Sequence, residues 1–229
     1  MLLLAADTSG KDGSTALVRG EGDGTCQLIE SEGLAGGSFS AQLVPQIAGL
    51  LSKHGFSKKD IGSFVVVSGP GSFTGLRVGL AAIKALAEVL AKPIAAVSLL
   101  EAVALAGGLT GTVIAAFDAG RRQIYVGEYE VSSGNARRIN ESLVTRDEFP
   151  GLVRGTSVIT PSSEIASLGR STGTDVLVIT APDLGYIAHL GWKKILAGET
   201  VTPESLEANY ISQPHAAILS SEFVPKKGA

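Results

Sequence analysis

The sequence contains a single cysteine, Cys26, among its 229 residues. One thiol cannot build an internal disulfide framework or a multi-cysteine metal site, so both kinds of stabilised domain are excluded. Aromatic residues make up only 5% of the chain, whereas there are 29 glycines, so the core must consist of small and aliphatic side chains. The length suits one large domain or two small ones.

Histidine is also scarce. His54, His189 and His215 lie far apart with no HExxH or HxxxH spacing, so zinc-hydrolase chemistry has no ligands. No G-x-S-x-G nucleophile elbow occurs, and Ser72 is better explained as the N-cap of a helix. Cys26 stands in a strand-like context and is expected to be a small core residue.

The chain lacks both a strong charge excess and a long hydrophobic run. Its net charge is −3, with acids interspersed among the bases, so it is not expected to bind a nucleic acid alone. The N-terminus, MLLLAADTSG, has no basic region that would start a signal peptide. The uncharged stretch 34–52 contains Gln42, Pro45 and Gln46 and suits an amphipathic helix. We therefore expect a soluble cytoplasmic protein without membrane contact.

Two segments about half the chain apart repeat one pattern. Residues 2–20 and 112–130 each give an apolar strand, an aspartate (Asp7 or Asp118), a short turn and a second strand. This repeat predicts two related lobes, 1–108 and 109–211, and the tail 212–229 is expected to fray or to return to the first lobe.

In the first lobe, the alternation and the helical spacing of apolar residues predict the remaining strands and helices. Strands are predicted at 25–33, 63–69 and 93–98, and helices at 38–54, 72–91 and 99–108. The second lobe gives strands at 135–142, 156–160 and 175–180 and a helix at 183–199, whereas 160–174 shows no clear pattern. The fold class is therefore α/β, with mixed sheets and helices on their faces.

The sequence SGPGSFTGLRVG (68–79) joins a buried strand to a helix. It is neither a Walker A loop nor the dinucleotide fingerprint, although a glycine turn before a helix can still bind an anion. The two aspartates either flank a magnesium–phosphate between the lobes or cap their hairpin turns. The candidate phosphate site, which we interpret as vestigial, comprises Asp7, Thr8, Ser9, Gly69, Gly71, Ser72 and Asp118.

Gly71, Gly75 and Gly79 recur at intervals of four, which forms a smooth ridge on one helix face. Each interior glycine costs about 1 kcal/mol relative to alanine, so close approach of another backbone is the favoured explanation. The expected neighbour is the helix at 38–54 or the same surface of a partner.

The segments LLAADTSG, SGPGSFTGLRVGLAAIKALA, PIAAVSLLEAVA and AAFDAGRRQIYVGEYE resemble the TsaB (YeaZ) family, and ANYI at 208–211 resembles its C-terminal tyrosine segment. The resemblance implies two ribonuclease-H-like lobes of the actin-like ATPase superfamily. It also implies a non-enzymatic role in making threonylcarbamoyladenosine on tRNA, in which the chain binds and activates the catalytic subunit TsaD and helps to recruit the ATPase TsaE.

Several positions depart from the pattern of this family and of its catalytic paralogue. Leu99 and Val103 stand where the paralogue has its metal-binding histidines, and neither can ligate a metal. Phe39 replaces an expected histidine, and Ser212 replaces a common arginine. The resemblance thus implies no catalytic residue, no metal and no required cofactor, with at most weak binding of ATP, ADP or magnesium.

Partners follow from the same resemblance. TsaD is expected to bind the first two helices in a four-helix bundle, a homodimer is expected when TsaD is absent, and tRNA is expected to bind only through the complex. The predicted interface residues are Gln42, Leu43, Gln46, Ile47, Gly75, Leu76, Gly79, Leu80 and Ile83.

Two alternatives remain open from the sequence. The chain could be an ATP-dependent transferase or kinase that uses Asp7 and Asp118, or a peptidase, as the older label "glycoprotease" suggests.

Overall fold

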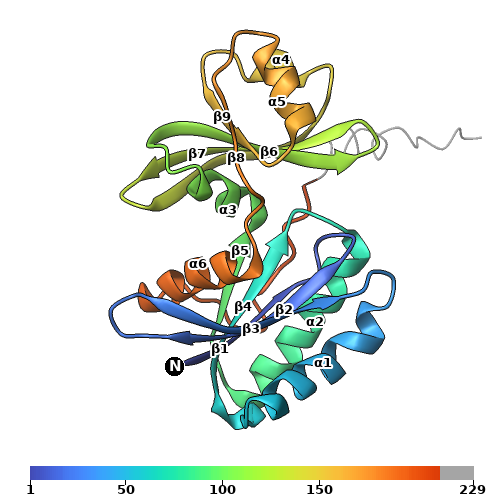
Figure 1. Cartoon of the computed structure of the whole chain (residues 1–229), viewed down its shortest axis with the longest axis vertical. Coiled ribbons are helices and arrows are strands. Elements are labelled where there is room, and N and C mark those ends of the chain that lie inside the picture. Colours follow the sequence, from blue (N-terminus) through green and yellow to red (C-terminus); the bar gives the residue numbers. More distant parts are fainter. Residues whose placement is uncertain (212–229) are drawn as a thin grey trace, which may run out of the picture.

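The computed structural model describes residues 1–211 as two lobes, each built on a five-stranded sheet (Figure 1). The first sheet has the order β3-β2-β1-β4-β5, and the second has the order β8-β7-β6-β9-β10. Strand for strand the two orders are the same, which confirms the predicted repeat and the α/β class with mixed sheets.

The sheet of the N-terminal lobe buries both of its faces. Within β1, Leu4 and Ala6 face one hydrophobic core and Leu3 and Ala5 face another, as alternation in a strand requires. Antiparallel pairing joins the first three strands, and β4 and β5 continue parallel to β1. The strands are β1 (Leu2–Asp7), β2 (Gly13–Gly20), β3 (Cys26–Leu34), β4 (Ile61–Gly69) and β5 (Ile94–Ser98).

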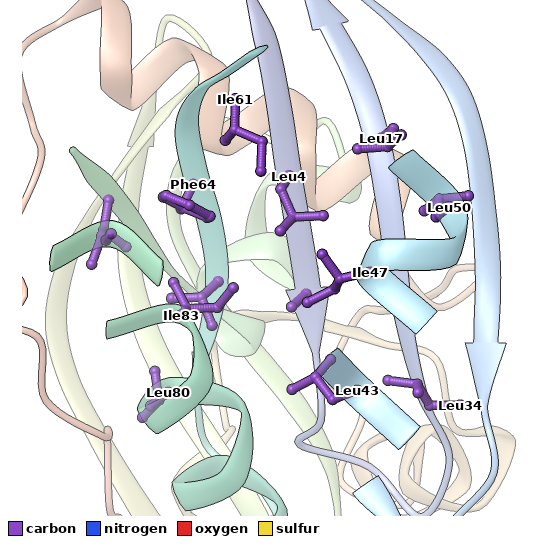
Figure 2. Packing of buried hydrophobic residues seen from close by; sticks show 14 of the residues in the cluster. Leu4, Leu17, Leu34, Leu43, Ile47, Leu50, Ile61, Phe64, Leu80 and Ile83 are labelled. Carbon is purple, nitrogen blue, oxygen red and sulfur yellow. The ribbon is translucent and has the colours of Figure 1, made fainter. Parts of the chain in front are cut away.

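Two long helices cover one face of this sheet: α1 (Phe39–Lys53) and α2 (Phe73–Leu90). Their apolar stripes meet Leu4, Leu17 and Phe64 in a single core (Figure 2). Ser72 is the N-cap of α2, as predicted, because its Oγ accepts a hydrogen bond from Gly75 N at 3.2 Å. A short 3-10 turn, η1 (Lys58–Asp60), leads into β4.

The sheet of the C-terminal lobe is formed by β6 (Gly111–Gly120), β7 (Gln123–Ser132), β8 (Asn135–Thr145), β9 (Ser157–Thr160) and β10 (Val176–Val178). Its outer face carries α4 (Phe149–Leu152) and α5 (Ser163–Arg170). The patternless stretch 160–174 thus contains a helix, which starts where Ser162 Oγ accepts from Ile165 N.

Two helices pack differently from the predicted division of the lobes. α3 (Leu99–Ala106) lies between the two sheets: Leu100 and Val103 are buried against the C-terminal sheet, and Ala102 belongs to a core of the N-terminal sheet. α6 (Leu184–Leu196) lies on the second face of the N-terminal sheet, with Trp192 in that core (Figure 1).

α3 is therefore shared by both lobes, and α6 covers the N-terminal sheet although it was predicted within 109–211. Periodicity shows that a helix has a buried face, but not which sheet covers it. The segment after α6 also returns to the N-terminal lobe, since Val201 pairs with Ile94 and Leu206 is buried in the first core. The predicted tail, 212–229, lies outside the described residues. Within residues 1–211 no helix is long and apolar enough to cross a bilayer.

Candidate functional site

A cleft of about 720 Å³ opens between the two lobes. One wall is the turn after β1 together with the start of α2, and the opposite wall is the β6–β7 hairpin. Apolar side chains make up much of the lining: Phe39, Val78, Leu99, Phe117 and Tyr125. Polar groups line it as well: Ser9, Lys11, Ser40, Ser72, Thr74 and Asp118.

The structure brings together only part of the predicted phosphate site. Ser9, Gly71, Ser72 and Asp118 line the cleft, which supports a shared location for them. Thr8 is buried behind the wall and donates from Oγ1 to Gly75 O at 2.7 Å. Asp7 and Gly69 are also outside the lining residues.

The Asp7 carboxylate forms its hydrogen bonds within its own turn. Its Oδ1 accepts hydrogen bonds from Ser9 N at 2.8 Å and from Ser9 Oγ at 2.6 Å. Burial raises the pKa of this carboxyl above its ordinary value, although the bonds from Ser9 act in the opposite direction. This geometry is the turn-capping interpretation of Asp7, one of the two that the sequence left open.

Asp118 has a different environment although it occupies the matching place in the second hairpin. Its side chain is half exposed, its Oδ1 accepts from Gly120 N at 3.2 Å, and it lies 3.6 Å from Arg146 Nη2. Arg146 is further paired with Glu164. The Asp118 carboxylate, which lines the cleft, is therefore paired with the Arg146 guanidinium.

The glycine loop is held by backbone contacts within the chain. Ser72 N donates to Ser9 O at 2.7 Å, and Asn209 N donates to Ser68 O at 2.7 Å. Gly69 has a φ of 125°, and a Cβ there would lie 2.8 Å from Asn209 O. These bonds join the loop to the segments that contain Ser9 and Asn209. Because Ser72 N already donates to Ser9 O, it is not available to a phosphate.

The glycine ridge has a neighbour different from the predicted one. A Cβ at Gly75 would overlap Thr8 O, one at Gly79 would overlap Thr8 Oγ1, and one at Gly71 would overlap Ser9 O. Close backbone approach is indeed the role of the ridge, but it packs on the end of β1 rather than on a helix or a partner.

The predicted interface residues are corrected in the same way. Leu43, Ile47, Leu76, Leu80 and Ile83 are at most 6% exposed, and the four labelled in Figure 2 point toward the sheet. The two glutamines face this chain as well. Gln46 Nε2 donates to Thr15 Oγ1 and Gly33 O at 3.2 Å, and Gln42 bonds Ser38. The five apolar side chains stabilise the N-terminal lobe and are not accessible to a partner, whereas Gln42 and Gln46 are half-buried and remain partly accessible.

The opposite faces of the two helices are apolar and uncovered. On α1 the exposed residues include Ala41, Val44, Ala48 and Gly49. On α2 they include Phe73, Ala81, Ala85 and Val89. Val44 and Phe73 are each 52% exposed and Val89 is 74% exposed. We call this surface the outer helix face; on it both helices expose apolar and small residues in addition to those that they bury in the core.

A buried carboxylate at the junction of the lobes was not predicted. The Glu141 side chain is 4% exposed and accepts hydrogen bonds from Ser98 Oγ at 2.9 Å, Asn209 Nδ2 at 2.5 Å and Tyr129 Oη. Burial and the nearby Glu141 raise the pKa of Tyr129, so its hydroxyl stays a donor. A lone glutamate in a strand shows no pattern that would have revealed this junction.

Sequence reasoning also missed a contact between Cys26 and His189, whose Sγ and Nδ1 lie 3.5 Å apart. Burial raises the pKa of the thiol, whereas burial and Lys193 lower that of the imidazole. Both shifts favour neutral groups, the opposite of an activated thiolate–imidazolium pair. Neither residue lines the cleft.

The cleft offers few ligands from this chain to a magnesium–phosphate. Among residues 1–211 no group of three or more His, Cys, Asp or Glu side chains is placed to hold a metal ion. Leu99, the position matched to a metal-binding histidine of the catalytic paralogue, lies in the lining as an apolar side chain. The polar lining groups include the Asp118 carboxylate, the Lys11 ammonium and the hydroxyls of Ser9 and Ser72. Magnesium at a phosphate site is usually held by one or two carboxylates together with phosphate and water oxygens, so most of its ligands here would come from the phosphate and water.

Comparisons with known proteins agree with this architecture. A family model described as TsaD, tRNA N6-adenosine threonylcarbamoyltransferase, matches residues 33–152, more than half of the chain. The tRNA threonylcarbamoyladenosine biosynthesis protein TsaB of Bacillus subtilis is 36% identical over 135 residues, which cover 58% of this chain and 57% of that protein. For TsaB of Escherichia coli the identity is 33% over 134 residues, covering 57% and 55%.

A solved structure of YeaZ from Pseudomonas aeruginosa matches with a TM-score of 0.69 at 22% identity, covering 92% of this chain and 99% of that chain. The matches to the curated relatives span little more than half of their length.

Two lobes with one repeated sheet order define a two-lobed α/β protein, and the match to YeaZ shows that this fold is shared. The chain belongs to the family whose model is described as TsaD, tRNA N6-adenosine threonylcarbamoyltransferase, and the curated relatives that it resembles are TsaB proteins.

Proposed function

We propose that this protein is a non-catalytic subunit in the synthesis of threonylcarbamoyladenosine on tRNA, and that it binds and activates the catalytic subunit TsaD. The proposal is supported by the curated relatives, which are named as biosynthesis proteins of this nucleoside. In this proposal the ATPase TsaE joins the assembled pair, and tRNA binds through the complex.

The outer helix face carries the proposal. Its small residues, Ala41, Ala48 and Ala81 among them, allow two more helices to approach closely, as packed helices do at about 8–10 Å. Burying a large exposed side chain such as Val44 or Val89 contributes roughly 1.5–3 kcal/mol. A helix pair of TsaD would cover this face, and a second copy of the chain would cover it when TsaD is absent.

The cleft supports a non-catalytic role. Its lining mixes apolar side chains with the hydroxyls of Ser9, Ser72 and Thr74 and with Lys11, and its glycine loop is bonded to other segments of the chain. The carboxylate of the described lining, Asp118, is paired with Arg146. None of these groups is arranged as a general base, a nucleophile or a metal ligand.

Reconstitution tests the proposal. TsaD and TsaE encoded in the same genome are incubated with tRNA, ATP, threonine, bicarbonate and the enzyme that supplies the threonylcarbamoyl group. Threonylcarbamoyladenosine is then measured by mass spectrometry of the digested tRNA. We expect product only when this chain is added and a stable complex between it and TsaD on gel filtration. Equal product without the chain would refute the proposal.

A matched assay addresses the kinase alternative. The isolated chain is titrated with Mg-ATP by calorimetry, and ATP consumption is followed. Tight binding with turnover would favour the alternative.

A further inference from the structure

A cluster of three exposed side chains stands at the start of α2. The rings of Phe73 and Tyr210 lie 5.0 Å apart between centroids, and the Arg77 guanidinium carbon is 3.7 Å from the centroid of Phe73. Arg77 Nε also donates to Tyr210 Oη at 3.1 Å. Phe73 is 52% exposed and Tyr210 is 46% exposed, so the cluster is on the surface. We call these three residues the α2 anchor.

The anchor is held rigidly by a segment from the far end of the chain. Next to Tyr210, Asn209 bonds Ser68 through its backbone and Glu141 through its side chain. Leu206 of the same segment is buried in the core under α2. An exposed arginine normally samples many rotamers, but stacking and a hydrogen bond fix this one, so little side-chain entropy remains to be lost on binding.

Among residues 1–211 the guanidinium of Arg77 has no acidic partner. No carboxylate of these residues forms an ion pair with it, and only its Nε takes part in a hydrogen bond with another of them. Its two terminal nitrogens are therefore left to bind a planar acceptor in the bidentate geometry that arginine forms with carboxylates.

A groove extends from the anchor along α2. Arg77, Leu80, Ala81 and Lys84 form one side, and the segment 206–210 forms the other. Glu207 also lines the groove without pairing with Arg77. Lys84 also interacts electrostatically with Glu204, so among residues 1–211 the unpaired positive charge of this groove is that of Arg77, which suits one carboxylate rather than a run of RNA phosphates. The groove includes Ala81 and so continues into the outer helix face.

We propose that the α2 anchor receives an aspartate or glutamate side chain of TsaD, flanked by apolar residues, at one end of the interface formed by the outer helix face. This inference rests on the proposed function, because it names a contact within that interface. The aromatic rings exclude water from one side of the ion pair, which strengthens the attraction compared with an open surface pair.

Binding of TsaD to variants of this chain tests the anchor. Arg77→Gln removes the charge and is expected to weaken the complex roughly 10- to 100-fold in calorimetry. Tyr210→Phe removes only the hydroxyl that orients Arg77 and is expected to weaken it by roughly 3-fold. Lys59→Gln, which neutralises an exposed cation of η1 at the opposite end of β4, is the control and should bind like the unmodified chain.

Salt dependence gives a second measurement. Raising NaCl from about 50 to about 300 mM should weaken the unmodified complex more than the Arg77→Gln complex, because the variant lacks the ion pair.

The outcomes separate the two proposals. If the unmodified chain fails to bind TsaD, the proposed function is wrong and the anchor with it. If the complex forms and Arg77→Gln binds as tightly as the unmodified chain, the anchor is wrong and the proposed function stands. A loss confined to tRNA binding by the assembled complex, with TsaD affinity unchanged, also overturns the anchor.

Discussion

The two lobes have separate sheets with the same strand order, but they differ in the helices that connect the strands. Between the third and fourth strands, the N-terminal lobe has the 15-residue α1, whereas the C-terminal lobe has the four-residue α4. After the fourth strand, α2 has 18 residues and α5 has eight. The common sheet is therefore a scaffold, and the long helix pair of one lobe supplies the surface that we propose for TsaD.

The aspartates that end β1 and β6 show the same divergence at a smaller scale. Asp7 is half-buried and accepts hydrogen bonds from Ser9, whereas Asp118 is half exposed and lies beside Arg146. Equivalent places in a repeated fold thus carry one structural and one surface carboxylate, which argues against a shared catalytic role for the pair.

The largest effect on stability is expected at the glycine ridge. Gly75→Ala places a methyl group on Thr8 O, a backbone atom that cannot move freely, and should lower the free energy of unfolding by about 3 kcal/mol. Gly169→Ala in α5 meets a methyl of Val176 at 2.9 Å and should cost about 1 kcal/mol.

Gly49→Ala serves as the matched control in urea unfolding. A Cβ at Gly49 contacts nothing within 4 Å, so this substitution should raise stability by roughly 0.5–1 kcal/mol through helix propensity. Equal effects of the three substitutions would remove the distinction between the tight contact of α2 and the looser one of α5.

The junction between the lobes is the next test. Glu141→Ala leaves the hydroxyls of Tyr129 and Ser98 and the amide of Asn209 without their acceptor and should cost about 2 kcal/mol. Glu141→Gln retains an acceptor oxygen and should cost about 1 kcal/mol. Thermal unfolding gives both values; no change in either variant would show that the buried network does not hold the lobes together.

The smallest expected effects on stability are those of substitutions at Asp7 and Asp118, and only the effect at Asp7 should depend on pH through a raised pKa. Because burial raises the pKa of Asp7, the folded state holds this proton more tightly than the unfolded chain, and stability falls as pH rises above the ordinary value of 3.8. Asp7→Asn removes that penalty and keeps an oxygen for Ser9, so the variant should be more stable by under about 1 kcal/mol at pH 7.

The advantage of Asp7→Asn should vanish below pH 3.8, where both the folded and the unfolded carboxyl are protonated. Asp118→Asn should change stability by less than about 0.5 kcal/mol, since its ion pair is exposed. Urea titrations at several pH values measure both, and a larger effect at Asp118 would reverse the comparison.

Much of the fold could be predicted because its strands and helices have clear periodicity. The β-branched run before Gly69 and the three-and-four spacing of Leu76, Leu80 and Ile83 gave the right elements. Periodicity does not say what covers a buried face, so it did not reveal that α3 lies between the two sheets or that α6 covers the N-terminal sheet. For the same reason Leu43 and Ile47 were assigned to a partner although they pack on their own sheet.

The candidate site was less predictable. Ser9 and Asp118 share a cleft as expected, but their relation to Arg146 depends on a contact between distant segments. The Glu141 junction and the α2 anchor join residues 68 and 133 positions apart in the chain, which no local pattern reveals.

Complex formation by two matched surface variants tests the central claim most directly. Val44→Arg changes the outer helix face, and Leu152→Arg changes an equally exposed apolar residue of α4 in the other lobe, at 52% and 49% exposure. Mixed with TsaD and analysed by gel filtration with light scattering, Leu152→Arg should form the complex. Val44→Arg should bind at least about 100-fold more weakly while remaining folded. An intact complex with Val44→Arg, or its loss with Leu152→Arg alone, would contradict the account.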